Sequence, residues 1–402
     1  QRPAGAPGAP GAPAPGAPGQ QAPAAQGQQP PPALGQQPPA AQGQQPPPAG
    51  QPAQAPSPQR PAAVAAPTSP SAPPPAQPPA QPAVTQSGAI APQPAGAQGQ
   101  PLRRVDDIRS ERREVREGDR LVIREPDRVI IREGNQTIIR HNETNRFLMI
   151  GGREVGVDRR GTETTTIVER PDGTRIITVT DDDGRLIRRI RRTPEGREVI
   201  IIDSRDSWQP GATYYVDLPP PVVRIPRERY IVEAARATPE IIYETLMAPP
   251  VELIDRRYTL EQIRFSEPLR ERMSRVDLDT INFDTGSWEI APDQINRLAI
   301  IGNAMSRAIG SNPGEVFLIE GHTDAVGSDV DNLSLSDRRA ESAALALSQR
   351  FSIPAENLTT QGYGEQYLKV PTQAAERANR RVTVRRITPL LTGQNQSTGQ
   401  AQ

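Results

Sequence analysis

The sequence predicts an α+β protein. Its C-terminal part, residues 277–388, is expected to be an α/β sandwich with a four-stranded sheet and two main helices on one face. Three observations predict this class. From about residue 277, short strand-like segments alternate with segments whose apolar residues recur at helical spacing. Residues 103–205 repeat short β-branched runs between turn signals. Residues 1–102 contain 30 of the 47 prolines of the chain and no aromatic residue.

The N-terminal 102 residues are predicted to be a disordered tether. Arg2 and Arg60 are their only charged residues, and a Gly-Gln-Gln-Pro-Pro unit recurs there with a period of eight residues. Such a composition buries too little apolar surface to offset the entropy of ordering the backbone. A tether of polyproline II character would span roughly 55 Å as a coil and about 300 Å when extended. A short proline-rich recognition motif remains an alternative.

Residues 103–205 are predicted to form a charged antiparallel β-meander. Short runs such as 120–124, 128–132 and 136–140 place Val, Leu, Ile or Thr between polar ends, and turn signals separate them. The region holds 24 arginines against 21 acidic residues, so opposite charges can pair across neighbouring strands. Because the two signs nearly balance, a solvated sheet surface with salt bridges is favoured over binding to nucleic acid.

Residues 206–276 are predicted to be a connector. Proline clusters interrupt the segment, and two short helices are expected, at 239–247 and 260–273. The apolar spacing of the second helix is loose, so both are expected to pack onto neighbouring elements. At the other end of the chain, residues 389–402 are expected to be a disordered tail.

The C-terminal domain is predicted from its alternating pattern. One helix is expected to begin at Pro292, a residue well suited to the first helical turn. A second is expected to begin near Ser334 or Ser336, which are both competent N-caps. The loop between the second strand and the second helix carries the sequence Gly-His-Thr-Asp-Ala-Val-Gly. The four expected strands lie at 280–283, 316–319, 358–363 and 382–384.

The composition excludes several kinds of chemistry. The chain has no cysteine and two histidines, so thiol catalysis and a zinc site rich in cysteine or histidine are excluded, and no metal or cofactor is expected. No apolar run is long enough to cross a bilayer as a helix. The net charge is zero, which gives no bulk attraction to nucleic acid or to an anionic membrane. Residue 1 is not methionine, which suggests that an upstream segment is missing.

Four motifs in the C-terminal region resemble the OmpA-like C-terminal family. They are Gly-His-Thr-Asp ending at Asp324, Asn-Leu-Ser-Leu-Ser-Asp-Arg-Arg-Ala from Asn332, Gly-Tyr-Gly-Glu from Gly362, and Arg-Ala-Asn-Arg-Arg-Val from Arg377. Their order matches that of the family, which makes the resemblance specific. It covers about residues 277–387, and it implies binding to the diaminopimelate residue of a peptidoglycan stem peptide.

By motif position, the paired charges of the family fall on Asp324 and Arg339. A free amino-acid head group carries an ammonium and a carboxylate a few ångströms apart. A guanidinium suits the carboxylate because it can donate two parallel hydrogen bonds, and a fixed carboxylate suits the ammonium. The alternative is a structural salt bridge between Asp324 and Arg339 that joins the loop to the helix.

Five further residues are expected to line the ligand site by motif position. Thr323 and Asn332 could offer hydrogen bonds, and Arg380 could add a second positive group. Phe283 and Leu335 could cover the aliphatic part of the ligand. The alternatives are a strand-edge charge for Arg380 and ordinary core positions for Phe283 and Leu335.

Some positions depart from the family pattern or invite another interpretation. Glu376 stands where many family members have glycine, and the segment 367–370 replaces a loop that commonly begins with proline; both would affect the edge of the site. Lys369 is interpreted as a surface residue. His322 is expected to orient its loop through a hydrogen bond, because the only other histidine is His141.

These observations predict a non-enzymatic peptidoglycan-binding protein of the cell envelope. It is expected in the periplasm, associated with the cell wall and linked to the outer membrane, where it would help to maintain envelope integrity. A hydrolase is not favoured, because no activated nucleophile or acid–base pair is recognisable. The alternative is an adhesin or assembly scaffold in which residues 103–205 bind an envelope protein and the C-terminal domain attaches to the wall. No nucleic-acid partner is expected.

Overall fold

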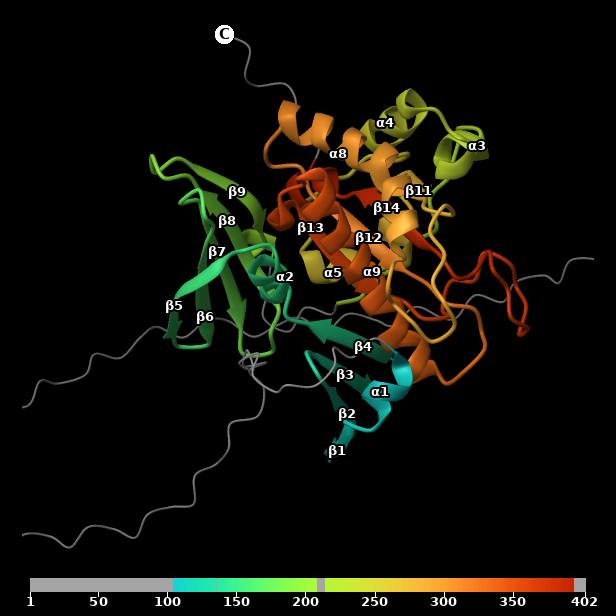
Figure 1. Cartoon of the computed structure of the whole chain (residues 1–402), viewed down its shortest axis with the longest axis horizontal. Coiled ribbons are helices and arrows are strands. Elements are labelled where there is room, and N and C mark those ends of the chain that lie inside the picture. The colour runs from blue at the N-terminus through green and yellow to red at the C-terminus, as the bar shows by residue number, and fades with distance from the viewer. Residues whose placement is uncertain (1–103, 135, 208–213, 394–402) are drawn as a thin grey trace, which may run out of the picture. The chain divides into compact units, whose positions relative to one another are not determined.

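The computed structural model describes residues 104–134, 136–207 and 214–393. The tether predicted for 1–102 lies outside these residues, as does most of the tail predicted for 389–402. The predicted fold class is confirmed: antiparallel sheets precede a mixed α/β domain (Figure 1).

The C-terminal domain is built on a five-stranded sheet in the order β10-β11-β14-β12-β13. Strand β14 is antiparallel to both β11 and β12, whereas the pairs β12–β13 and β10–β11 are parallel. The strands are β10 (Ile231–Glu233), β11 (Arg275–Asp277), β12 (Phe317–Gly321), β13 (Leu358–Gly362) and β14 (Val382–Arg386). The sheet therefore has five strands where four were predicted: three of the predicted strands are present, and β10 and β11 were not predicted.

The segment predicted as a strand at 280–283 is not a strand. Strand β11 ends at Asp277, and the backbone then turns, with Ile281 N donating to the carbonyl of Leu278 at 3.3 Å. Leu278 and Ile281 are both buried. Their three-residue spacing suits a turn, whereas burial on one face of a strand would need a spacing of two.

Helices cover both faces of this sheet. Three of them lie on one face: α4 (Pro239–Met247), α8 (Ala299–Ser311) and α9 (Asp329–Phe351). The other face is covered by α5 (Leu260–Phe265), α6 (Glu267–Arg270) and α10 (Thr388–Thr392). Phe317 and Ile319 point to the first layer and Leu318 to the second, as the alternation of a strand requires.

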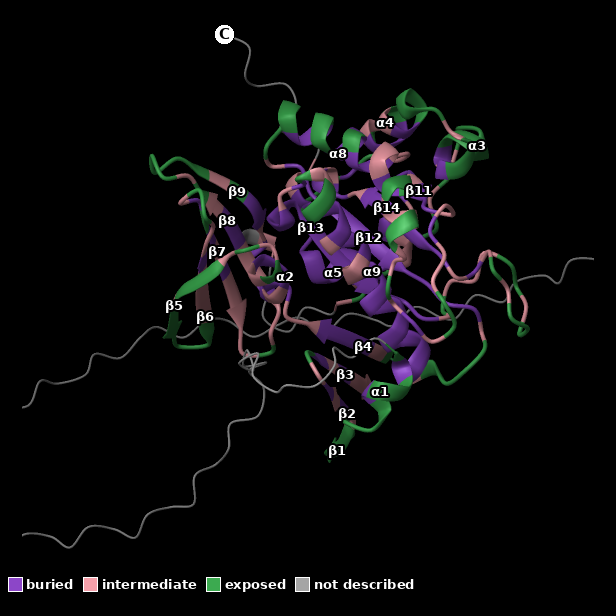
Figure 2. Ribbon diagram, in the orientation of Figure 1, coloured by how far each residue is buried: buried purple, intermediate pink, exposed green. Residues whose placement is uncertain are grey.

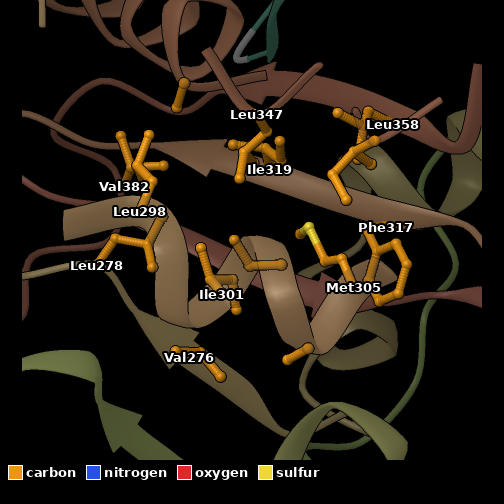
Figure 3. Packing of buried hydrophobic residues seen from close by; sticks show 14 of the residues in the cluster. Val276, Leu278, Leu298, Ile301, Met305, Phe317, Ile319, Leu347, Leu358 and Val382 are labelled. Atoms are coloured by element: carbon orange, nitrogen blue, oxygen red, sulfur yellow. The ribbon is translucent and has the colours of Figure 1, made fainter. Parts of the chain in front are cut away.

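The main core lies between the sheet and helices α8 and α9. Figure 3 shows Leu298, Ile301 and Met305 facing the strand residues Phe317 and Ile319. The helix predicted from Pro292 begins there as α7 (Pro292–Ile295) and passes through a 3₁₀ turn (Asn296–Leu298) into α8. Helix α10 crosses the boundary predicted at residue 388, because Leu390 and Leu391 are buried against the second layer.

Helix α9 begins earlier than predicted. Its N-cap is Ser328, whose hydroxyl accepts a hydrogen bond from the backbone N–H of Asp331 at 3.2 Å. Ser334 and Ser336, the predicted starts, are both buried inside the helix. Ser336 donates its hydroxyl to the carbonyl of Leu333 at 2.8 Å. The first turns of α9 are therefore already formed before these serines.

Two glycines let α9 lie directly on the sheet. Gly321 and Gly362 are registered partners on the parallel strands β12 and β13. A Cβ added at Gly321 would lie 1.9 Å from the carbonyl oxygen of Ser336, and one at Gly362 would lie 2.4 Å from the backbone nitrogen of Asp337. Only glycine allows so close an approach between two backbones. This contact fixes α9 over the ends of β12 and β13.

The region predicted as one meander forms two separate sheets. The first sheet has the order β1-β2-β3-β4 and the second the order β5-β6-β7-β8-β9, all antiparallel. Helix α2 (Thr144–Met149) separates them. The strands are β1 (Arg113–Glu117), β2 (Arg120–Glu125), β3 (Arg128–Glu133), β4 (Gln136–His141), β5 (Arg153–Arg160), β6 (Glu163–Glu169), β7 (Arg175–Asp181), β8 (Leu186–Arg192) and β9 (Glu198–Asp203). Positive-φ glycines such as Gly173, Gly184 and Gly196 occupy the turns of the second sheet.

The remaining elements are short. They are α1 (Val105–Arg109), α3 (Arg227–Tyr230) and the 3₁₀ turns Arg205–Ser207, Ala234–Arg236 and Ala355–Asn357. The two helices expected in the connector are present: the first as α4 with the predicted bounds, and the second divided into α5 and α6.

The first sheet packs onto helix α9. Ile123, Ile130 and Ile139 form a small core with Leu333 of α9. Buried polar contacts surround it: Arg128 Nε lies 2.9 Å from Asp337 Oδ2, and Glu125 accepts a hydrogen bond from Ser334. Figure 2 shows β4 and the facing part of α9 as mostly buried, whereas β1 at the far edge is exposed. The first sheet is therefore part of the folded C-terminal unit.

One buried histidine joins the first sheet to α9. His141 of β4 places Nδ1 2.9 Å from Asp337 Oδ2 and Nε2 3.5 Å from Glu341 Oε2. Burial alone would lower the pKa of His141, but the two carboxylates outweigh burial and raise it to about 9. His141 is therefore protonated at neutral pH and forms an ion pair across the contact.

The raised pKa predicts a pH-dependent stability. A group whose folded pKa exceeds its unfolded pKa stabilises the fold fully below the unfolded value, and this contribution is lost as the pH rises through the folded value. The His141→Gln variant should therefore be less stable than wild type by about 3 kcal/mol at pH 6, and the gap should narrow as the pH approaches 10. Urea denaturation of both proteins across this pH range measures the gap. A gap that stays constant with pH would contradict the ion pair.

Candidate functional site

The predicted site residues gather at the carboxyl ends of β12 and β13. The loop after β12 is held on both sides, because His322 N donates to the carbonyl of Arg381 and Thr323 N donates to the carbonyl of Gly364, each at 2.9 Å. Asp324 follows in this loop, and Arg339 reaches the same region from the third turn of α9. The close packing of α9 on the two glycines brings the helix and the loop together.

Arg339 is fully buried and held by backbone carbonyls. Its Nε donates to the carbonyl of Ser287 at 3.0 Å and its Nη2 to that of Asp284 at 3.2 Å. The ring centroid of Phe283 lies 4.9 Å from the guanidinium carbon, a cation–π arrangement. The third nitrogen, Nη1, is buried and has no hydrogen-bond partner.

Arg339 lies near one positive side chain, Arg380, and one negative side chain, Asp324. Burial and the nearby charge of Arg380 lower the pKa of Arg339 to about 10, whereas Asp324 acts in the opposite direction. Arg339 therefore still carries its positive charge at neutral pH. Because the charge is buried and Nη1 is unpaired, an anion placed beside this nitrogen would be bound favourably.

Asp324 is paired with Arg380 in the structure. Its Oδ2 accepts hydrogen bonds from Arg380 Nη1 at 2.6 Å and from the backbone N–H of Glu376 at 3.3 Å. Its Oδ1 accepts from the backbone N–H of Val326 at 3.4 Å. No salt bridge within 4.0 Å joins Asp324 to Arg339 among the described residues, so the alternative of a structural bridge between this pair is wrong.

The other polar residues expected at the site adjoin this group. Thr323 is buried and its Oγ1 has no hydrogen-bond partner. Asn332 is also buried and donates from Nδ2 to Glu365 Oε2 at 2.6 Å. Arg380 is 34% exposed, so its side chain has room to change partner. The alternative interpretation was that Arg380 is only a charge at the edge of a strand. Its hydrogen bond to Asp324 shows that it has a specific partner.

The two apolar residues expected at the site differ in their contacts. Phe283 is partly buried, packs against the main core and also faces Arg339. Leu335 is 8% exposed on α9. Phe283 therefore packs against the core, as the alternative proposed, and also faces Arg339 at the expected ligand site.

The expected hydrogen bond of His322 is not formed. Both ring nitrogens are buried without a hydrogen-bond partner, and Nε2 lies 3.7 Å from Glu320 Oε2. The ring instead stacks on Tyr363, with 5.7 Å between centroids. Burial and the charge of Arg381 lower the pKa of His322 to about 3, despite the opposite effect of Glu320. The ring of His322 is therefore neutral and packed, and it is the backbone N–H of His322 that holds the loop to Arg381.

Two contacts at the site were not predicted. The carbonyls of Asp284 and Ser287 hold Arg339, and only the fold brings this loop to α9. Lys369, interpreted as a surface residue, places Nζ 2.8 Å from Glu233 Oε1 and 3.0 Å from Asp277 Oδ2. The charge of the buried Asp277 explains why a lysine is held there.

No cluster of three or more histidine or acidic side chains suited to a metal ion is found in 104–134, 136–207 and 214–393. In that same part of the chain, no helix combines the length and the apolar character that crossing a bilayer requires.

Comparison with known proteins gives matches to the C-terminal region. The family model described as "OmpA family" matches residues 282–381. The lipoprotein YfiB of Escherichia coli is 34% identical over 113 residues, which are 28% of this chain and 68% of YfiB.

Two solved structures are also similar. The peptidoglycan-associated lipoprotein of Burkholderia pseudomallei is 24% identical, with a TM-score of 0.23, covering 26% of this chain and 87% of that one. The periplasmic domain of Helicobacter pylori MotB is 18% identical, also with a TM-score of 0.23, covering 27% of this chain and 69% of that one.

Proposed function

Because the chain belongs to the OmpA family, we propose that its C-terminal domain binds peptidoglycan non-covalently through the diaminopimelate residue of the stem peptide. The OmpA-like domain family is known for peptidoglycan association in envelope proteins.

One observation carries the proposal: Thr323, the neighbour of Asp324 in the chain, and Arg339, whose charge interacts with that of Asp324, each have a buried polar atom without a hydrogen-bond partner. They are Nη1 of Arg339 and Oγ1 of Thr323. A buried polar group without a partner is costly, and most such groups in folded proteins are paired. A bound ligand would supply the missing partners, which supports a binding site at this position.

The charges around Asp324 fit the two ends of an amino-acid head group. The carboxylate of the ligand would accept from Nη1 of Arg339, and its ammonium would donate to Oδ1 of Asp324, whose one backbone contact is long at 3.4 Å. Arg380 now occupies Oδ2. As a partly exposed side chain, it can turn from Asp324 toward the carboxylate of the ligand, so both charges of the ligand would be balanced.

The remaining residues would shape the site around the ligand. Phe283 already covers the guanidinium of Arg339, and together with Leu335 it would contact the aliphatic chain. Asn332 is held by Glu365 and would offer its amide oxygen to the ligand. No residue in this arrangement is given a catalytic role, so the protein is proposed to anchor to the wall without chemistry.

The proposed cellular role follows from wall binding. The protein would reside in the periplasm, attached to the cell wall and linked to the outer membrane, and would help to maintain envelope integrity. Residues 103–205 would support the C-terminal domain, because the first sheet uses buried charges such as Arg128 to hold α9.

The scaffold alternative has less support. A partner strand could add to an exposed edge such as β1, in which every residue is exposed. However, four of its five residues are charged, and charged edge strands resist pairing with another chain.

Sedimentation with purified sacculi tests the proposal. The Arg339→Lys and Asp324→Asn variants should each reduce the fraction bound by about tenfold or more, because each removes one of two charge-assisted contacts to the ligand. Both substitutions preserve side-chain size, so thermal melting should confirm that the domain remains folded.

Two exposed residues outside the proposed site, one arginine and one aspartate, provide matched controls. Arg350 lies exposed near the end of α9, and Asp293 lies exposed in α7. Arg350→Lys and Asp293→Asn make the same chemical changes away from the site and should sediment like wild type. If all four variants sediment equally, the assigned site is wrong.

A further inference from the structure

A second candidate site lies away from Asp324 and Arg339. A cavity of about 260 Å³ is enclosed between the second sheet and the segment that links β4 to α2, with α5 beside it. Most of its lining residues have polar side chains, with Val157 and Leu186 as apolar members, but apolar atoms make up most of the lining surface. None of the proposed wall-binding residues lines this cavity, so the inference drawn from it does not depend on the proposed function.

The wall formed by the second sheet presents a regular array of hydroxyl groups. Thr166 of β6, Thr178 of β7 and Arg189 of β8 are successive cross-strand partners. Thr164 and Thr180 are partners in the adjacent row. Cross-strand partners project from the same face of a sheet, and all five residues line the cavity. The wall therefore combines four threonine hydroxyls with one guanidinium.

The opposite wall is built around Glu143 at the start of α2. Its Oε2 accepts from Arg189 Nη2 at 2.7 Å, and its Oε1 accepts from Arg264 Nη2 at 2.6 Å. Oε1 also accepts from the hydroxyl of Thr359 and the backbone N–H of Thr360. The carboxylate of Glu143 is therefore fully occupied.

Several N–H groups of the two arginines have no partner. Arg189 is 2% exposed, yet its Nε and Nη1 have no hydrogen-bond partner, and Nε of Arg264 has none either. Burial lowers the pKa of Arg189 despite the opposite charge of Glu143, and the neighbouring Arg146 and Arg264 add to the effect. Buried donors of this kind require an acceptor. Arg146 and Arg264 have further acidic partners in Glu341 and Glu261, whereas the ion pairs of the described residues give Arg189 Glu143 alone.

From these contacts we propose that the cavity binds an acidic monosaccharide. The carboxylate of such a ligand would accept from the unpaired N–H groups of Arg189 and Arg264. Its hydroxyls would exchange hydrogen bonds with the threonine rows, and its C–H groups would contact the threonine methyls and Val157. The volume is near the lower end for ligand pockets, which suits one sugar ring better than a longer chain.

The cavity has an opening for such a ligand. Val157 is 53% exposed, and Glu154 beside it on β5 is also exposed, so the edge formed by β5 opens to solvent. The arginines lie at the buried end. A ligand would enter with its carboxylate first and leave its hydroxyls nearer the opening.

Titration of the full chain with D-glucuronate and D-glucose tests the proposal. The two sugars differ by a carboxylate in place of a hydroxymethyl group. Calorimetry and saturation-transfer NMR should show glucuronate binding about tenfold or more tightly than glucose, because its charge meets unpaired guanidinium donors. If neither sugar binds, the cavity holds solvent only. If both bind equally, the carboxylate has no role in binding. Either result overturns the proposal.

Substitutions on one strand locate the binding. Thr166→Val removes a hydroxyl facing the cavity but keeps the branched shape, and it should weaken glucuronate binding by about threefold to tenfold. Thr165→Val makes the same change on the opposite face of β6 and should bind like wild type. Thr178→Ser retains the hydroxyl and should retain binding. If Thr165→Val and Thr166→Val change glucuronate affinity equally, the site is wrong. Binding to sacculi should be unchanged in all three variants.

Discussion

The Gly321→Ala variant should lose about 3 kcal/mol of its free energy of unfolding. The added Cβ would lie 1.9 Å from the carbonyl oxygen of Ser336, so the backbone of α9 would have to move away from the sheet. Backbone atoms cannot yield as a flexible side chain can. The same contact places Arg339 and Asp324 together, so this variant should also bind sacculi more weakly than wild type.

Gly310→Ala is the matched control for this prediction. Gly310 lies in α8, and a Cβ at this position would meet nothing within 4 Å. Alanine favours a helix over glycine, so Gly310→Ala should raise the free energy of unfolding by about 0.5–1 kcal/mol. Urea denaturation of the two variants gives both values. Similar effects at Gly310 and Gly321 would contradict the close packing of α9 on the sheet.

The Glu143→Gln variant should lose about 3–5 kcal/mol of stability. Glu143 is buried and receives charge-assisted bonds from Arg189 and Arg264, with Arg146 3.8 Å away. Burial would raise the pKa of Glu143, but these arginines lower it well below its usual range. The neutral amide has nearly the same shape, but it would leave the buried guanidinium of Arg189 without its counter-charge, whereas Arg264 and Arg146 would keep Glu261 and Glu341 as partners.

An exposed ion pair supplies the control for Glu143. Glu198 lies 2.5 Å from Arg192, and their side chains are 38% and 44% exposed. Exposed pairs contribute little, so Glu198→Gln should change the free energy of unfolding by about 0.5 kcal/mol or less. Thermal or urea unfolding of both variants measures the difference. If Glu143→Gln is as mild as Glu198→Gln, water must reach the arginine cluster and the description of it as buried is wrong.

The alternating pattern of the C-terminal sequence was sufficient to predict its sandwich. Strands β12, β13 and β14 overlap the segments predicted at 316–319, 358–363 and 382–384. Strand β10 has three residues, too few for a periodic signal. The start of α9 was missed because three serines could each cap it, and the choice of Ser328 depends on tertiary packing.

The separation of the meander into two sheets was also not predictable from the pattern. Turn spacing indicates which strands form hairpins, but α2 has only six residues and carries a weak helical signal. The contacts of His141 and Arg128 with Asp337 were also not predictable, because about 200 residues separate these groups along the chain.

The assignment of the site residues stays a prediction, but the structure shows contacts that motif position did not indicate. Motif position indicated Asp324, Arg339 and Arg380, and the structure brings them to the end of the same sheet. Their bonds depend on the fold: Arg339 donates to carbonyls more than fifty residues earlier, and Asp324 binds Arg380. Motif spacing carries no information on such long-range contacts.

Titration of the full chain with two stem tripeptides tests the central proposal most directly. L-Ala-γ-D-Glu-meso-diaminopimelate and L-Ala-γ-D-Glu-L-Lys both end in a side-chain amine, but only the first adds a carboxylate beside it. If Arg339 binds that carboxylate and Asp324 binds the amine, the diaminopimelate peptide should bind about tenfold or more tightly than the lysine peptide. The Arg339→Lys substitution should largely abolish this preference. Equal affinity of wild type for the two peptides would contradict the proposed site.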